Sequence, residues 1–92
     1  MQNIDTKKIE TADERILATL KDVDTYLQKD EWAYKRTKFD LRDDKTLKIT
    51  REAFTMFDLR GIDEAATANN ALWYIGSAYP SNLDVTITLY VN

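Results

Sequence analysis

Residues 83–91 alternate between apolar and polar side chains, a pattern typical of a β-strand with one buried face. Leucine, valine or isoleucine occupies every second position from Leu83 to Val91, and threonine occupies two of the four positions between them. A strand with such a threonine-rich face is typical of an antiparallel sheet that is covered on one side only. The segment therefore predicts a sheet with one face in the core and one face in solvent.

A different spacing, with apolar residues three or four positions apart, predicts an amphipathic helix over residues 12–28. The apolar stripe of this helix consists of Ala12, Ile16, Leu20, Val23 and Leu27. Thr11 and Glu14 have the spacing of a capping box, in which each side chain accepts a hydrogen bond from the other residue's backbone N–H. We therefore expect the helix to begin directly after Thr11.

Alternation returns in the middle of the chain and predicts further strands. Residues 32–41 and 46–50, separated by a polar turn at 42–45, indicate a β-hairpin. Four apolar residues are expected on its buried face: Phe39, Leu41, Leu47 and Ile49. Residues 53–59 also alternate and are rich in Phe and Thr, which favours a third strand, with a short helix as the alternative.

An alanine-rich segment over residues 62–75 predicts the second long helix, with Gly76 placed to end it. The predicted order is therefore helix, strand, strand, strand, helix, strand, which we write α-β-β-β-α-β. This order favours an α+β fold, a two-layer sandwich in which an antiparallel sheet carries two helices on one face. We expect one domain over residues 1–92, because the chain is too short for two.

The absence of cysteine and histidine limits the chemistry that this chain can perform. It excludes disulfides, thiolate nucleophiles, the usual zinc ligands and the usual general base near neutral pH. With only two glycines, no phosphate-binding loop can form. The adjacent carboxylates Asp30-Glu31 and Asp43-Asp44 fall at expected turns, where Asp bonds to local backbone. We therefore expect no enzymatic activity, no catalytic residue, no cofactor and no metal site.

Charge is distributed unevenly, although the net charge is only −3. Residues 35–51 contain seven basic and three acidic residues, a balance of +4, and no Lys or Arg follows Arg60. The N-terminus lacks the features of a signal peptide, and no apolar stretch approaches the ~20 residues that span a bilayer. We therefore expect a soluble cytoplasmic protein without a membrane partner.

Two groups of residues are candidates for a partner-binding site. If residues 32–38 form a strand, one face of it presents Trp32, Tyr34, Arg36 and Lys38. Two rings and two cations suit a protein interface or single-stranded nucleic acid, whereas the alternative is that the rings pack at the edge of the core. The second group is Trp73, Tyr74 and Tyr79, because four consecutive apolar residues at 72–75 cannot all face one core from a helix. The alternative is that these aromatic side chains are buried against the first helix.

These observations favour a small non-enzymatic protein-binding module, an inhibitor or accessory factor that covers a surface of a partner macromolecule. The basic segment predicts a partner protein with an acidic patch. Regulators of this size are typical of phages and other mobile elements, and we keep such an origin as a hypothesis. Two alternatives remain, a nucleic-acid-binding domain that uses the hairpin 32–51 and a structural or assembly subunit that oligomerises through its sheet edge. The sequence leaves the oligomeric state open.

Overall fold

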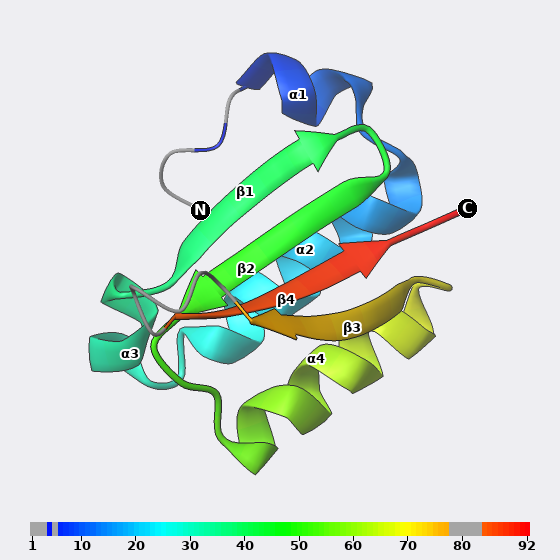
Figure 1. Ribbon diagram of the computed structural model, residues 1–92. Coiled ribbons are helices and arrows are strands. Elements are labelled where there is room, and N and C mark those ends of the chain that lie inside the picture. Colours follow the sequence, from blue (N-terminus) through cyan, green and yellow to red (C-terminus); the bar gives the residue numbers. More distant parts are fainter. Residues whose placement is uncertain (1–3, 5, 78–83) are drawn as a thin grey trace.

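A four-stranded antiparallel sheet with the strand order β1-β2-β4-β3 organises the fold (Figure 1). The computed structural model describes residue 4 and residues 6–77 and 84–92. The strands are β1 (Lys38–Asp43), β2 (Thr46–Arg51), β3 (Leu72–Ser77) and β4 (Val85–Tyr90). The helices are α1 (Thr6–Thr11), α2 (Glu14–Leu27), α3 (Glu31–Lys35) and α4 (Met56–Ala68). The predicted α+β class and the antiparallel sheet are confirmed.

The central strands β2 and β4 carry the middle of the core. Leu47 and Ile49 of β2 lie opposite Leu89 and Ile87 of β4, and all four side chains are fully buried. The last strand is therefore confirmed over Val85–Tyr90, with Ile87 and Leu89 in the core as predicted. Thr88, predicted for the solvent-facing side, is also buried, and Leu83 lies outside the described residues.

The helices α2 and α4 pack side by side on one face of the sheet, and the face turned toward the viewer in Figure 1 carries neither of them. Ile16, Leu20 and Val23 from α2 and Ile62 from α4 are almost completely buried against the sheet. The buried set matches the predicted helical stripe, because helical periodicity places these α2 residues on one side. The prediction of two helices on a single face is confirmed.

The start of α2 differs from the predicted capping box. Asp13, and not Thr11, caps the helix, because its carboxylate accepts from the backbone N–H of Arg15 at 2.9 Å. The Arg15 guanidinium also donates to this carboxylate, at 3.0 and 2.9 Å. Thr11 instead ends α1, where its hydroxyl donates to backbone carbonyl groups of that helix. The predicted start at residue 12 is therefore wrong by two residues.

Stability at low pH should report on this cap. The hydrogen bonds from Arg15 lower the pKa of the Asp13 carboxyl from 3.8 to about 2. A carboxyl with a lower pKa in the folded state stabilises the fold above its unfolded pKa, and this contribution is lost as the pH falls toward 2. We expect the stability difference between wild type and Asp13→Asn to shrink from about pH 5 to about pH 2. Urea unfolding at each pH measures it, and a pH-independent difference would contradict the prediction.

Residues 31–35 form the helix α3, so the predicted strand from residue 32 is wrong in its first half. Asp30 caps this helix, because its carboxylate accepts from the backbone N–H of Ala33 at 3.1 Å. The side chains of Trp32 and Arg36, four residues apart, then stack on each other. A cap and one stacked pair stabilise a single helical turn that the alternation of aromatic residues does not predict. The rest of the hairpin is confirmed, with Phe39, Leu41, Leu47 and Ile49 buried as predicted.

The predicted third strand over residues 53–59 is also wrong, because a capping box starts α4 at Met56. The Thr55 hydroxyl accepts from the backbone N–H of Asp58 at 3.1 Å, and the Asp58 carboxylate accepts from that of Thr55 at 2.8 Å. The buried guanidinium of Arg51 lies 3.3 Å from the same carboxylate. These contacts fix the helix start six residues before the predicted position.

The helix α4 ends at Ala68, so the predicted helix 62–75 is wrong in its second half. Asn70 has φ 57°, and the N–H of Ala71 donates to the carbonyl of Ala66 at 2.8 Å, as in a Schellman motif. The chain then turns into β3. The observed order is therefore α-α-α-β-β-α-β-β, in place of the predicted α-β-β-β-α-β.

Candidate functional site

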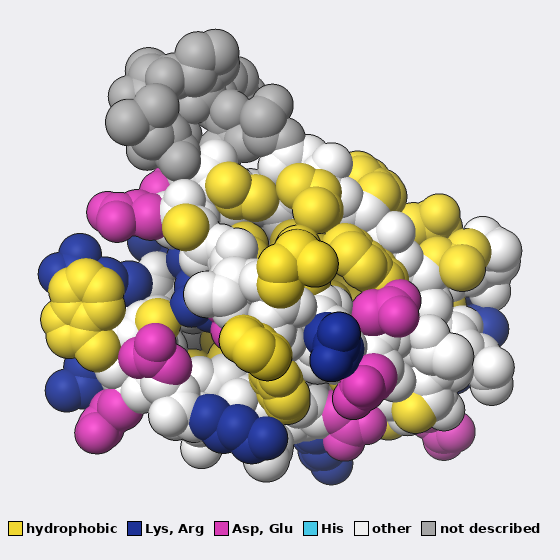
Figure 2. Space-filling model, turned by 90° about the horizontal axis from the view of Figure 1, so that it is seen from below, with side chains coloured by type: hydrophobic (Ala, Val, Ile, Leu, Met, Phe, Trp, Pro, Cys, Tyr) yellow, Lys and Arg dark blue, Asp and Glu magenta, His cyan; other side chains and the backbone are white. Residues whose placement is uncertain are grey.

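Large apolar side chains that are more than half exposed form two groups in the described part of the chain. The first group lies on α3 and the first turn of α4, a region that we call the helical end, and comprises Trp32, Met56 and Phe57. The second group lies on the outer strand β3, which we call the β3 edge, and comprises Leu72, Tyr74 and Ile75. Figure 2 views the molecule from below and shows hydrophobic side chains gathered across this side, among scattered charged ones.

The helix α3 presents Trp32 and Arg36 as one unit. Its hydrogen bonds place the two residues one turn apart, and the guanidinium carbon of Arg36 lies 4.1 Å from the centre of the Trp32 ring. The ring nevertheless remains 66% exposed. The stack therefore restricts the orientation of the ring without covering it, which lowers the entropy lost on binding.

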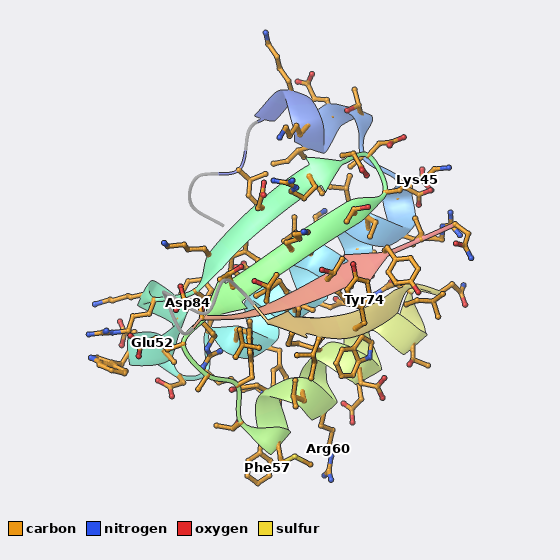
Figure 3. The ribbon with its side chains drawn as sticks, in the orientation of Figure 1. Lys45, Glu52, Phe57, Arg60, Tyr74 and Asp84 are labelled. Carbon is orange, nitrogen blue, oxygen red and sulfur yellow. The ribbon has the colours of Figure 1, made fainter. Side chains whose placement is uncertain are left out.

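The first turn of α4 places Met56 and Phe57 in solvent, where they are 78% and 73% exposed. The Tyr26 hydroxyl of α2 donates to the backbone carbonyl of Phe57 at 2.8 Å and fixes this turn against α2. Figure 3 shows Phe57 and Arg60 projecting from α4 away from the sheet. Both apolar residues were missing from the predicted site, although the Thr55-x-x-Asp58 capping box is a sequence signal for this helix start.

An open hollow of about 340 Å³ lies between the junction of α2 with α3 and the start of α4. Its lining consists of Tyr26, Leu27, Lys29, Asp30, Thr55, Phe57 and Asp58. The volume is near the lower limit for small-molecule sites, which enclose most of their ligand. An open hollow of this size suits one side chain of a protein partner better than an enclosed ligand.

Cations border the rings of the helical end. The ammonium nitrogen of Lys29 lies 4.5 Å from the centre of the Tyr26 ring, and Arg36 stacks on Trp32. Lys35 adds an exposed charge on α3, whereas the Asp30 carboxylate is engaged as the cap of that helix. Glu31, in the first turn of the same helix, is exposed as well, so the rings of the helical end are bordered by charges of both signs.

The structure separates the four side chains that were predicted to share one strand face, Trp32, Tyr34, Arg36 and Lys38. Tyr34 points to the opposite side of α3, where its hydroxyl donates to Asp24 and its ring centre lies 6.2 Å from that of Phe39. Burial, together with the hydrogen bond to Asp24, raises the pKa of Tyr34. Lys38 is exposed at the start of β1. The predicted shared face is wrong, because residues two apart on a helix point about 200° apart.

The second predicted group lies on β3 and not on a helix. The indole N–H of Trp73 donates to the Asp63 carboxylate of α4 at 2.8 Å, so this ring faces the helix layer. Tyr74 points to the opposite face, is 52% exposed, and has its ring centre 5.8 Å from that of Tyr90. Tyr79 lies outside the described residues. Strand alternation therefore leaves Tyr74 as the exposed ring of this pair.

The open face of the β1–β2 hairpin carries mixed charges. Asp40 lies opposite Lys48 in the strand register, and the Arg42 guanidinium lies 3.5 Å from the Asp40 carboxylate. The one aromatic side chain of these two strands, Phe39, is buried in the core. Within residues 32–51, the exposed pair of ring and cation therefore lies on α3, as Trp32 and Arg36, and not on the two strands.

Comparisons with known proteins add no functional information. The sequence matches no protein-family model and no curated protein. Within residues 4, 6–77 and 84–92, no three acidic residues lie close enough to hold a metal ion. None of the helices in these ranges has the length and apolar character needed to cross a membrane. The two exposed surfaces, the helical end and the β3 edge, are therefore the candidates for a functional site.

Proposed function

We propose that this chain is a small non-enzymatic protein-binding module, an inhibitor or accessory factor that covers a surface of a partner protein with its helical end. The observation that carries the proposal is the exposed Trp32 ring, held in place by Arg36. Phe57 is exposed on the first turn of α4, at the hollow that Lys29 and Asp30 of the α2–α3 junction also line, and Met56 is exposed on the same turn. The few residues that contribute most of the binding energy at protein interfaces are enriched in tryptophan, tyrosine and arginine.

The local geometry limits the conformational entropy that is lost when a partner binds. Caps at Asp30 and Thr55 define the starts of α3 and α4, and the hydrogen bond from Tyr26 fixes the backbone at Phe57. The partner therefore meets a backbone that needs little further ordering. Trp32 and Phe57 bury their rings against the partner, and the hollow beside Phe57 receives one partner side chain.

The partner surface should carry an acidic patch. Lys29, Lys35 and Arg36 lie on α3 or next to its ends, where they outnumber the acidic Asp30 and Glu31. Exposed cations accelerate the encounter with an acidic surface and favour one binding orientation. The absence of cysteine accords with a reducing compartment, and we propose that the module acts in the cytoplasm as one of the regulators carried by phages or mobile elements.

Site-specific photocrosslinking tests the location of the contact. A photoreactive amino acid replaces Phe57 in one variant and Thr67, exposed near the end of the same helix, in the control. Both variants are added to extracts of the cells that carry the gene. We expect one protein to crosslink at position 57 and not at 67. Equal crosslinking at both positions contradicts the proposal.

Affinity for the captured protein provides a quantitative prediction. The double substitution Trp32→Ala with Phe57→Ala should weaken binding by at least about 2 kcal/mol, roughly thirtyfold, because both rings lose their contact. The melting temperature should change little, since both side chains are exposed. Calorimetric titration measures the affinity, with Thr67→Ala as the control. Unchanged affinity with an intact fold would remove the helical end from the interface.

Salt dependence distinguishes this proposal from nucleic-acid binding. The stacked pair of Trp32 and Arg36 could also stack on a base, and phosphate contacts would then release counterions. We expect a shallow dependence of affinity on salt, typical of a protein partner. A steep dependence, together with binding of single-stranded oligonucleotides, would favour the alternative.

A further inference from the structure

The strand β3 forms an outer edge of the sheet and is bonded to β4 on one side. Its six residues, Leu72–Ser77, include no charged residue and no proline. The register with β4 runs without a bulge through all six pairs. Proteins usually protect an edge strand with charges, proline, a bulge or a covering element, because its backbone groups can pair with another chain. These sequence and register protections are missing from β3.

The opposite edge strand of the same sheet, β1, carries several of these protections. Charged residues occupy four of its six positions, and its register is irregular between Leu41 and Asp43. The helix α1 also lies next to β1 (Figure 1). Within the described residues, the two edges of the sheet are therefore protected unequally, by sequence and by register.

Side chains on both faces of β3 are available to an added strand. Leu72 and Tyr74 share the open face of the sheet, where Tyr74 lies beside Tyr90. Ile75 shares the helix-side face with Trp73 and is still 52% exposed. A strand paired with β3 would cover the three exposed side chains and satisfy its backbone groups at the same time.

The position of α4 argues against a second copy of this chain as the occupant. The hydrogen bond between Trp73 and Asp63 holds α4 against β3, and Figure 1 shows the helix running along this strand. Paired strands lie about 4.8 Å apart, whereas packed helices need about 8–10 Å between their axes. Two copies joined through β3 would therefore bring their α4 helices too close together. A segment without its own helix meets no such obstacle.

We propose that the β3 edge accepts an extended segment of a partner protein by strand addition, with apolar residues alternating with basic ones. Apolar side chains of the segment pack on the open face beside Leu72 and Tyr74. The alternate side chains face the helix layer, where Asp63 places a carboxylate next to Trp73. Asp63 and Glu64 are both exposed on α4 and outnumber the one cation of that helix, Arg60, so a basic residue suits this side. The β3 edge is a separate surface from the helical end, which lies on α3 and the first turn of α4, two turns before Asp63.

Selection from a random heptapeptide display library tests the inference without knowledge of the partner. We expect the enriched peptides to alternate apolar and basic residues. Synthetic versions of these peptides should lose at least tenfold in affinity when alternate backbone nitrogens that pair with β3 are methylated, because strand addition depends on backbone hydrogen bonds. Hydrogen exchange should show new protection in β3 and in no other strand.

Matched variants identify the site. Tyr74→Ser should weaken peptide binding at least tenfold, and Asp63→Asn should weaken it by up to about fivefold, since an exposed ion pair contributes little. The Asn side chain keeps an acceptor for the Trp73 indole. Phe57→Ser is the control for the helical end, from which Tyr74 is well separated in Figure 3, and should leave peptide affinity unchanged. Circular dichroism verifies the fold of each variant.

Three results would overturn the inference. Enriched peptides that tolerate backbone methylation do not add as strands. Peptides that lose affinity with Phe57→Ser and keep it with Tyr74→Ser bind the helical end, which overturns strand addition at β3 and leaves the proposed function intact. A concentration-dependent dimer in sedimentation, dissociated by Tyr74→Ser, would make a second copy the occupant.

Discussion

Replacement of Leu20 by alanine is expected to lower the free energy of unfolding by about 2–5 kcal/mol. Leu20 lies in the middle of the apolar stripe of α2 and is 1% exposed. It belongs to the same core as the buried leucines and isoleucines of β2 and β4. Truncation removes the contacts of the lost atoms and leaves a cavity that a closely packed core fills only in part. Urea unfolding monitored by circular dichroism measures the loss.

The same chemical change at Leu72 is the matched control. This side chain is 51% exposed on β3, so Leu72→Ala should cost less than about 1 kcal/mol. Equal losses in the two variants would show that Leu20 is not a core residue. The comparison separates burial from any general effect of shortening a leucine.

Long periodic patterns made the central part of the fold predictable. The stripe that includes Ile16, Leu20 and Val23 spans several helical turns, and the alternation that includes Ile87 and Leu89 spans the whole of β4. Such repeats allow one orientation relative to the core, because any other would expose most of the apolar residues. These five side chains are all buried.

Short local contacts explain the regions in which the sequence-based prediction of secondary structure is wrong. Residues 32–38 alternate like a strand, yet the cap at Asp30 and the stack of Arg36 on Trp32 stabilise one helical turn. Alternation over so few residues does not distinguish a strand from a short helix. The end of α4 depends in the same way on Asn70, whose left-handed backbone reverses the chain before β3. Glycine is the residue that most often adopts this left-handed conformation at a helix end, so the end of the helix was wrongly predicted at Gly76.

The two candidate surfaces were only partly predictable. Trp32 and Tyr74 were identified as aromatic residues that need not be buried. The exposure of Phe57 depends on which side of α4 faces α2, and that orientation comes from packing. The role of β3 as an edge depends on the pairing of β2 with β4 across an intervening helix and strand. Single-sequence periodicity contains no signal for such long-range pairing.

The contact between α2 and α4 predicts the direction in which a substitution at Gly61 changes the free energy of unfolding. Gly61 lies on α4 directly against the Tyr26 ring, and a Cβ at position 61 would overlap that ring. The ring has little freedom to move, because its hydroxyl donates to the Phe57 carbonyl. We expect Gly61→Ala to lower the free energy of unfolding by about 1–3 kcal/mol through overpacking. Chemical denaturation of the two proteins measures this difference.

A double-mutant cycle with Tyr26→Ala tests the physical cause. Without a steric conflict, alanine in place of glycine stabilises a helix interior by about 1 kcal/mol. Once the Tyr26 ring is removed, Gly61→Ala should therefore raise the free energy of unfolding, whereas it lowers it in the presence of the ring. The coupling between the two positions is the difference between these opposite effects. If Gly61→Ala destabilises the protein equally in both backgrounds, the ring is not the obstacle, and close packing of α2 on α4 at Gly61 is wrong.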